Sequence, residues 1–280
     1  MHHIVTLTCH DRPGLVHAVT SGILDVDGNI VESHQFTEPD TLTFCMRIVV
    51  DSEVSDSGVI QSAIQSRLGG LDTSLTVRLA SRHPKLAVLV SKFDHCLVDL
   101  LYRWRTGDLA VDIAVVVSNH PDCRDVVEQH GIPYFHVPVS SDTKQASEDR
   151  LRQLIEQFSI DLVVLARYMQ VFSEVLCKEL ESRAINIHHS FLPSFKGASP
   201  YRQAHARGVK LIGATAHYVT ADLDEGPIIE QDVVRVDHAH TAEQLAALGR
   251  DIERSVLSRA VGLWSQNRVL LVGSKTVVFR

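Results

Sequence analysis

The first 80 residues alternate between the hydrophobic patterns of strands and helices. Residues 3–9, 29–50 and 73–80 carry β-branched and apolar residues at alternating positions, which predicts strands, and a turn at 37–41 divides the middle segment. Residues 56–70 predict an amphipathic helix that ends at two glycines. An earlier helix ends at Gly28 and carries its apolar residues on one face: Leu15, Val16, Val19, Ile23 and Leu24. The order β-α-β-β-α-β predicts a ferredoxin-like domain over residues 1–80.

A different pattern begins at residue 85, after a linker at 81–84 that contains Pro84. Short runs rich in Val and Ile alternate with helical stretches, which predicts a parallel sheet covered on both faces. These runs lie at 85–91, 111–118, 133–139, 160–166 and 184–187. Two longer strands at 211–220 and 226–236, a helix from Thr241 to about Trp264 and two short strands complete the chain. We therefore predict an α/β fold whose second domain, residues 85–280, is Rossmann-like with a mostly parallel sheet.

Composition narrows the class of protein. A formal net charge of −7 without a long basic run argues against a nucleic-acid partner, which requires clustered Lys and Arg. No apolar run reaches the roughly 20 residues of a membrane helix, and the N-terminal residues lack the charged and apolar regions of a secretory signal. Five scattered cysteines without a C-x-x-C pair are typical of reduced thiols. We expect a soluble, cytoplasmic protein that contacts no membrane.

The segment INIHHSFLPSFKG, residues 185–197, carries the first candidate chemistry. Asn186 and His188 lie two residues apart at the end of a predicted strand, so their side chains point to one face, while His189 is expected to point to the other. In parallel sheets ligands bind beyond the carboxyl ends of the strands. An amide and an imidazole at this place can donate to a carbonyl oxygen and transfer a proton. The alternative is a histidine that merely hydrogen-bonds at the end of a strand.

An acidic turn follows His217 and contains three carboxylates, Asp222, Asp224 and Glu225. Such close carboxylates repel one another, so a buried one should have a raised pKa unless a cation or donor lies nearby. This turn is a second candidate for chemistry, and a solvated acidic turn is the alternative.

Other kinds of site are weakly supported by the sequence. His217, His238 and His240 are candidate metal ligands, but no H-x-x-x-H or H-E-x-x-H spacing occurs, and we predict no metal site. Residues 88–101 contain no glycine, which argues against a dinucleotide site or a P-loop after the first strand of the second domain.

Three ordered motifs, N-I-H, S-F-L-P-S-F-K-G and H-x6-D-E-G-P-I-I, resemble the folate-dependent formyltransferase family. The resemblance covers residues 85–280 and implies that Asn186, His188 and Asp224 are catalytic, since Asp224 lies seven residues after His217. It also implies that the segment VVLARYMQVF, residues 163–172, holds the folate pterin. The substrate contacts that follow from it are Met169, Gln170, Phe172 and Asp222.

The N-terminal domain resembles an ACT domain, whose first turn commonly has the sequence D-R-P-G found at residues 11–14. The resemblance implies an amino-acid effector near a group of five residues: Asp11, Arg12, Gly14, Gly28 and Asn29. The alternative is that the two glycines only bound a helix and that Arg12 is a surface charge. Pairing of ACT domains implies a homo-oligomer.

An ACT domain followed by a formyltransferase-like domain resembles the formyltetrahydrofolate deformylase family. Two departures from the glycinamide ribonucleotide transferases favour this branch: His189 replaces a proline, and Asp94-His95-Cys96 replaces a phosphate-binding Gly-Ser-Asn loop. The resemblance implies hydrolysis of 10-formyltetrahydrofolate to formate and tetrahydrofolate without a metal or other cofactor. Asn186 and His188 would stabilise the oxyanion. Asp224 would polarise or deprotonate the water and keep His188 in its useful charge state, and His188 would protonate the leaving amine. The family role would be to balance one-carbon folate pools and supply formate for purine biosynthesis. Transfer to an amine acceptor and a folate-sensing regulatory protein are the alternatives.

Overall fold

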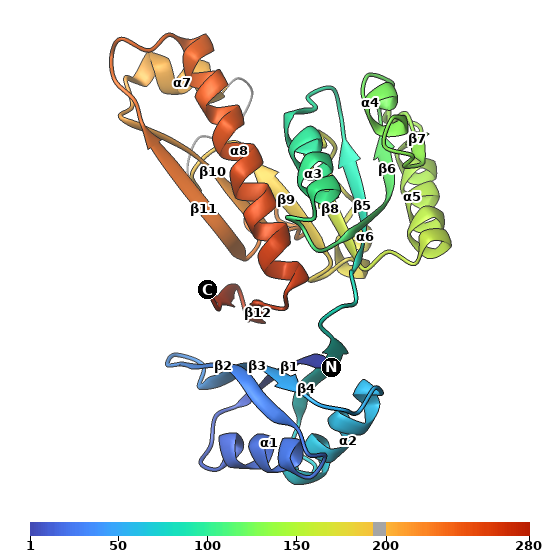
Figure 1. Ribbon diagram of the computed structural model, residues 1–280. Coiled ribbons are helices and arrows are strands. Elements are labelled where there is room, and N and C mark those ends of the chain that lie inside the picture. The colour runs from blue at the N-terminus through green and yellow to red at the C-terminus, as the bar shows by residue number, and fades with distance from the viewer. Residues whose placement is uncertain (193–199) are drawn as a thin grey trace. The chain divides into compact units, whose positions relative to one another are not determined.

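The computed structural model describes residues 1–192 and 200–280, and the chain divides into two compact units (Figure 1). The N-terminal unit comprises residues 1–83 together with 266–280, and the large unit comprises residues 84–265. We expected residues 266–280 in the second domain, whereas they group with the first.

The N-terminal unit contains the predicted sequence of elements: β1 (His2–His10), α1 (Leu15–Leu24), β2 (Asn29–Glu38), β3 (Thr43–Asp51), α2 (Ser57–Leu68) and β4 (Thr73–Leu79). Its four strands form an antiparallel sheet in the order β2-β3-β1-β4. The inward side of α1 differs from the prediction, because Val16 and Leu24 are exposed. Leu15, Val19 and Ile23 are buried, since residues four apart share one face of a helix. Val16 and Leu24 each lie one position after a buried residue, and a step of one residue turns the side chain by about 100° away from the core.

The C-terminal segment packs within the N-terminal unit as a hairpin of β12 (Val269–Val272) and β13 (Lys275–Val278). Leu270, Val272 and Phe279 form a buried cluster with Cys45 of β3. Nearby, Glu32 Oε1 accepts hydrogen bonds from Arg47 Nη1 at 2.7 Å and Arg268 Nη2 at 2.9 Å. These contacts explain why the last two strands belong to the N-terminal unit and not to the large unit, which contains the preceding helix.

The large unit is built on a seven-stranded sheet in the order β11-β10-β9-β8-β5-β6-β7. The five strands from β9 to β7 are parallel, whereas β10 and β11 are antiparallel, so the predicted α/β class with a mostly parallel sheet is confirmed. Its strands are β5 (Lys85–Val90), β6 (Asp112–Ser118), β7 (Tyr134–His136), β8 (Leu162–Leu165), β9 (Ala184–His188), β10 (Leu211–Tyr218) and β11 (Ile228–Arg235). Its helices are α3 (His95–Thr106), α4 (Arg124–Glu128), α5 (Lys144–Phe158), α6 (Glu174–Glu179), α7 (Pro200–Arg207) and α8 (Ala242–Ser265).

The hydrophobic core of the large unit forms between the sheet and its helices. Ala87 and Leu89 of β5 belong to one buried cluster with Leu151 and Leu154 of α5. Helix α8 packs on β9, β10 and β11 and lies beside α3 (Figure 1). The chain runs outward from β5 to β7 and then returns to β8 on the other side of β5. Such a reversal opens a crevice at the carboxyl ends of the strands, where ligands bind in open α/β sheets.

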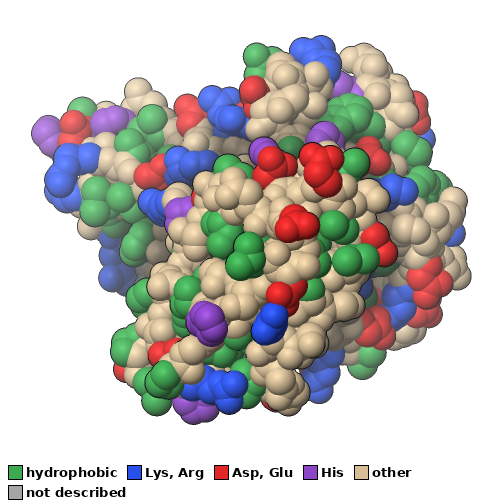
Figure 2. Space-filling view, turned by 60° about the horizontal axis from the view of Figure 1, so that its bottom comes forward, with side chains coloured by type: hydrophobic (Ala, Val, Ile, Leu, Met, Phe, Trp, Pro, Cys, Tyr) green, Lys and Arg blue, Asp and Glu red, His purple; other side chains and the backbone are tan. Residues whose placement is uncertain are grey.

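Charged side chains of both signs are interspersed with apolar ones over the face shown in Figure 2. Within residues 1–192 and 200–280, no helix combines the length and apolar character that a membrane crossing requires.

Candidate active site

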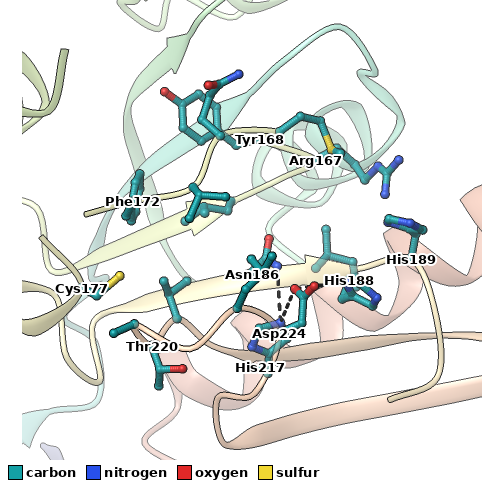
Figure 3. A pocket seen from close by; sticks show the side chains of 18 residues that line it. Arg167, Tyr168, Phe172, Cys177, Asn186, His188, His189, His217, Thr220 and Asp224 are labelled. Atoms are coloured by element: carbon teal, nitrogen blue, oxygen red, sulfur yellow. Dashed lines mark hydrogen bonds and ion pairs between the residues drawn. The ribbon is translucent and has the colours of Figure 1, made fainter. Parts of the chain in front are cut away.

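A pocket of about 270 Å³ lies where β8, β9 and β10 end (Figure 3). Its walls come from the segment that follows β8, from the last residues of β9, and from the turn that follows β10. The lining residues that had been predicted as catalytic or substrate-binding are Asn186, His188, Asp224, Met169, Gln170 and Phe172. Asp222 lies on the exposed part of the turn and is not among the lining residues, so its predicted contact with substrate remains untested.

Asn186 and His188 point into the pocket from the same face of β9, as their spacing predicts. Asn186 pairs with His217 in the antiparallel register between β9 and β10, and its amide Nδ2 lies 3.3 Å from His217 Nε2. His188 is buried at the carboxyl end of the strand. The sheet therefore fixes an amide and two imidazoles side by side.

Asp224 reaches the same cluster from the turn after β10. Its Oδ1 lies 3.1 Å from His188 Nδ1 and 3.7 Å from His217 Nε2. The turn is tight, since Asp224 has φ of 60° and a Cβ at Gly226 would overlap the carbonyl oxygen of Tyr218. Glycine at 226 is therefore required to bring Asp224 to the histidines.

The charge of Asp224 is stabilised by its neighbours. Partial burial raises the pKa of Asp224, but hydrogen bonds and charge interactions with His188 and His217 outweigh it and hold the pKa well below its usual range. The sequence left this open, because a buried carboxylate has a raised pKa only when donors are lacking. Asp224 is an ionised acceptor at neutral pH.

Hydrogen bonds orient the rings of the two histidines. His217 Nδ1 donates to the carbonyl oxygen of Tyr218 at 2.8 Å, and its Nε2 faces the Asn186 amide at 3.3 Å and Asp224 Oδ1 at 3.7 Å. His188 Nδ1 donates to Asp224, which leaves His188 Nε2 with a lone pair. That nitrogen is buried and has no hydrogen-bond partner within residues 1–192 and 200–280. A buried nitrogen without a partner costs about 1–3 kcal/mol, so the site favours a ligand or water at this place.

His189 lies in the pocket, contrary to the expectation that it points to the other face. Its ring stacks on His188 with centroids 4.8 Å apart and an interplanar angle of 23°. Alternation ends because β9 ends at His188, and Thr215 Oγ1 then binds the following segment by donating to the Ser190 carbonyl at 3.0 Å. Burial, together with the positive charge of Arg167 and that of His188 whenever His188 is protonated, lowers the pKa of His189 to about 4. His189 is therefore neutral at pH 7.

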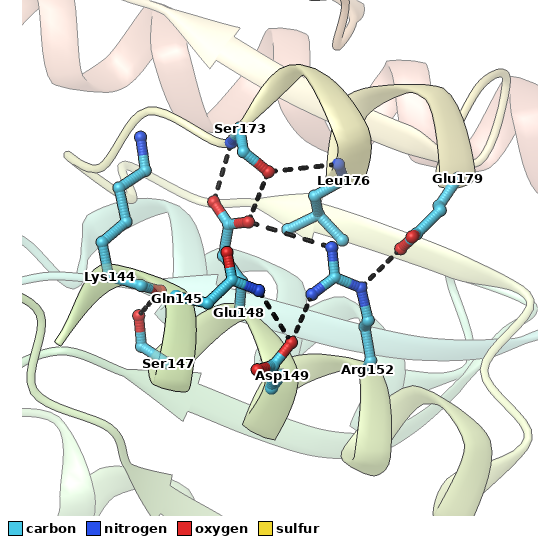
Figure 4. Close-up of polar contacts among 9 residues, drawn as sticks. All are labelled: Lys144, Gln145, Ser147, Glu148, Asp149, Arg152, Ser173, Leu176 and Glu179. Carbon is cyan, nitrogen blue, oxygen red and sulfur yellow. Dashed lines mark hydrogen bonds and ion pairs between the residues drawn. The ribbon is translucent and has the colours of Figure 1, made fainter.

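The segment after β8 is held by buried polar groups on two neighbouring elements. The Met169 amide donates to Ser91 Oγ at 3.0 Å, and Ser91 lies just after β5. At the other end, the Ser173 amide and hydroxyl donate to the two oxygens of Glu148 in α5 at 2.7 and 2.5 Å (Figure 4). Because Glu148 is buried, these contacts fix the backbone that lines the pocket.

Several lining residues were not identified as candidates from the sequence. They are Leu165, Arg167, Tyr168, Val171, Cys177, Ile187, Val219, Thr220, Ala221 and Leu223, and His217 had been considered only as a metal ligand. The sequence did indicate the segment 165–172, because it lies at the carboxyl end of a predicted parallel strand, where ligands bind. The turn after β10 carried no signal apart from its carboxylates.

The structure does not bring the three candidate metal-ligating histidines together. His240 contacts Asp237 at 2.8 Å on an exposed turn, whereas His217 is in the pocket. Among the described residues, ligand atoms with metal-like spacing occur on His95, Cys96 and Glu253, within 4.8 Å of one another. A guanidinium already lies beside this group, since Arg167 Nε is 3.4 Å from Glu253 Oε2.

The five residues predicted for an effector lie near the two ends of α1. Gly14 has φ of 92° directly before the helix, and Asp11 and Arg12 are exposed beside it. Gly28 lies beyond the other end, where a Cβ would press on Ile23 and Val50, and Asn29 begins β2. A helix of this length separates its ends by about 15 Å. One small ligand therefore does not contact both groups within a single copy, and the effector remains a prediction.

Comparisons with known proteins agree with both units. A family model described as Formyl transferase matches residues 84–261, and one described as ACT domain matches residues 2–78. A formyltetrahydrofolate deformylase from Corynebacterium sp. (strain P-1) is 47% identical over 280 residues, which is 99% of this chain and 98% of that protein.

Solved structures give the same result. A formyltetrahydrofolate deformylase from Burkholderia mallei ATCC 23344 has a TM-score of 0.96 at 45% identity and covers 100% of this chain and 99% of its own. A glycinamide ribonucleotide transformylase 1 from Symbiobacterium toebii has a TM-score of 0.68 at 29% identity and covers 74% of this chain and 98% of its own. The chain therefore belongs to the formyltetrahydrofolate deformylase family.

Proposed function

We propose that the protein is a hydrolase that cleaves 10-formyltetrahydrofolate into formate and tetrahydrofolate at the pocket around Asn186, His188 and Asp224. The observation that carries the proposal is His188, whose Nδ1 donates to Asp224 while its buried Nε2 remains open to a ligand among the described residues. A base and an amide donor beside each other are the groups that amide hydrolysis requires. The backbone of Met169, Gln170 and Phe172 would hold the folate ring.

The hydrolysis begins when water attacks the formyl carbon. His188 Nε2 accepts a proton from the water as the new C–O bond forms, and negative charge develops on the formyl oxygen. One N–H of the Asn186 amide is directed to His217, and the other is available to stabilise this oxyanion. Removing such a donor typically costs about 3–4 kcal/mol of transition-state stabilisation. The C–N bond then breaks, and His188 returns its proton to the leaving nitrogen.

Asp224 acts through charge and orientation in this scheme. A general base is most effective when its pKa lies near the working pH, and the pKa of Asp224 lies far below. Its carboxylate instead fixes the tautomer of His188 and stabilises the imidazolium that forms during attack. Of the roles expected for Asp224, we therefore propose the one that acts through His188 and not direct polarisation or deprotonation of the water.

Water, and not an amine, is the acceptor in this proposal. The sequence Asp94-His95-Cys96 stands where the related transferases have their phosphate-binding loop, and His95 is bound to the buried carboxylate of Glu253 at 2.8 Å. His95 Nε2 donates to this carboxylate and is therefore not free to bind a phosphate. This supports hydrolysis over transfer to a phosphorylated amine.

The wider roles rest on the family resemblance. We propose a cytoplasmic homo-oligomer that balances one-carbon folate pools and supplies formate for purine biosynthesis, with an amino acid bound at the ACT domain as effector. No metal, nucleic acid or membrane takes part in the proposal.

The test is formate release from 10-formyltetrahydrofolate with EDTA present and no amine acceptor. We expect turnover by the wild-type chain and a loss of about 10⁴-fold in Asp224→Asn, as expected when the group that orients a catalytic histidine is neutralised. Asp251→Asn, which neutralises an exposed carboxylate on α8, is the matched control and should retain turnover. Turnover that requires an added amine would instead support a transferase.

A further inference from the structure

The proposed hydrolysis would create an anion, formate, inside the pocket. The inference drawn from this anion rests on the proposed function. Formic acid ionises at neutral pH, so the product is a carboxylate formed next to the ionised carboxylate of Asp224. Two like charges at close range in a partly buried site repel each other. A cation within the pocket would therefore be needed to hold the product until it leaves.

Arg167 is the one Lys or Arg among the described residues that line the pocket. It directly follows the end of the buried segment at Ala166, and its φ of 64° lies in the left-handed region that a bulky residue rarely adopts. Such a conformation is strained and persists only when the surroundings impose it. Figure 3 shows Arg167 and His189 at the same end of the pocket.

Glu253 forms an ion pair with the guanidinium of Arg167. This carboxylate is 1% exposed, and its Oε2 lies 3.4 Å from Arg167 Nε. The same carboxylate accepts hydrogen bonds from His95 Nε2 at 2.8 Å and the Tyr201 hydroxyl at 2.6 Å. The contact with Glu253 is an ion pair and not a hydrogen bond, and Arg167 Nε is buried without a hydrogen-bond partner among residues 1–192 and 200–280. The guanidinium is therefore held by charge while its N–H groups can still donate to a ligand.

Neighbouring groups complete a site of the right chemistry. His189 is neutral and offers one ring N–H beside Arg167. It stacks on His188, the residue at which the formyl group is hydrolysed in our proposal. A planar guanidinium presents two parallel N–H donors that match the two oxygens of a carboxylate.

We propose that Arg167, supported by His189, forms a binding site for a small carboxylate and receives the formate product beside His188. The ion pair with Glu253 holds Arg167 in place, so Glu253 is a positioning residue for this site. The site would draw formate away from Asp224, and added formate should inhibit the enzyme by occupying it.

The test is direct binding of ¹³C-formate to the full chain, followed by NMR line broadening without folate. The wild-type chain should bind formate saturably, and Arg167→Met should raise the half-saturating concentration at least about tenfold, which corresponds to about 1.4 kcal/mol. Arg124→Met, which removes an exposed arginine of α4, is the matched control and should bind as the wild type does. Circular dichroism would check folding, and Arg167→Gln replaces Arg167→Met if the latter does not fold.

Equal half-saturation in the wild-type chain and the Arg167 variant would overturn the proposal, as would the absence of saturable binding in the wild type. Binding that depends on Arg167 in a chain that releases no formate from 10-formyltetrahydrofolate would uphold the carboxylate site and refute the proposed hydrolysis. The two failures are therefore distinguishable.

Discussion

Protonation of His189 should set part of the acid sensitivity of the large unit. The pKa of His189 is lowered to about 4 mainly by burial and by the charge of Arg167, against 6.5 for an ordinary histidine. The unfolded chain therefore takes up a proton below pH 6.5 that the folded chain refuses until about pH 4. This contribution to stability is complete above pH 6.5 and is lost as the pH falls toward 4.

The magnitude follows from the two pKa values. One pKa unit corresponds to 1.36 kcal/mol, so at pH 5 the free energy of unfolding should be lower by about 2 kcal/mol than at pH 7 through this residue alone. That figure is an upper value because the ring is partly exposed. His189→Gln removes the titrating group and should abolish this part of the pH dependence.

The assay is urea unfolding at pH 7 and pH 5, followed by tryptophan fluorescence. Trp104 and Trp264 both lie in the large unit, so the signal reports the unit that contains His189. His205→Gln, at an exposed position in α7, is the matched control and should behave as the wild type does. Identical pH dependence in the wild type and His189→Gln would refute the assignment of a partly buried, neutral histidine.

Three further substitutions test the supports of the pocket and of the N-terminal unit. Glu148→Gln weakens the two hydrogen bonds from Ser173 and should raise KM for the folate with a smaller change in kcat. Steady-state kinetics would measure both constants, with Asp149→Asn as the matched control, and an unchanged KM in Glu148→Gln would contradict the prediction. Gly226→Ala should lower kcat/KM by about 100-fold, because its Cβ would displace the turn that carries Asp224; wild-type activity would contradict this account of the turn. Phe279→Ala should lower the free energy of unfolding of the N-terminal unit by about 3 kcal/mol in urea titrations, whereas an unchanged value would show that the C-terminal hairpin contributes little.

Local periodicity predicted most of the elements, though not α6 and α7, and part of the site. The alternation of side chains along a strand placed Asn186 and His188 on one face, and this holds because both residues lie within β9. The same rule failed for His189, since the strand ends one residue earlier and Thr215 then sets the path of the chain. A rule based on regular structure does not extend beyond its last residue.

Long-range packing accounts for most of what the sequence did not reveal. The last two strands were recognised, but their pattern does not specify the sheet on which they pack, and the cluster with Cys45 decides it. Arg167 and Glu253 are far apart in the sequence, so their ion pair exists only in the folded unit. Helix α6 spans six residues, which is too short for a hydrophobic period to be visible, and its signal is the capping Ser173.

An isotope experiment shows whether water is the group that attacks the formyl carbon. The wild-type chain would hydrolyse 10-formyltetrahydrofolate in H₂¹⁸O with EDTA present and no added amine, and mass spectrometry would determine the label in the formate. Attack by water predicts formate that carries one ¹⁸O atom from the solvent, formed at the rate at which tetrahydrofolate appears. Tetrahydrofolate formed without labelled formate, or only when an amine is supplied, would contradict the account.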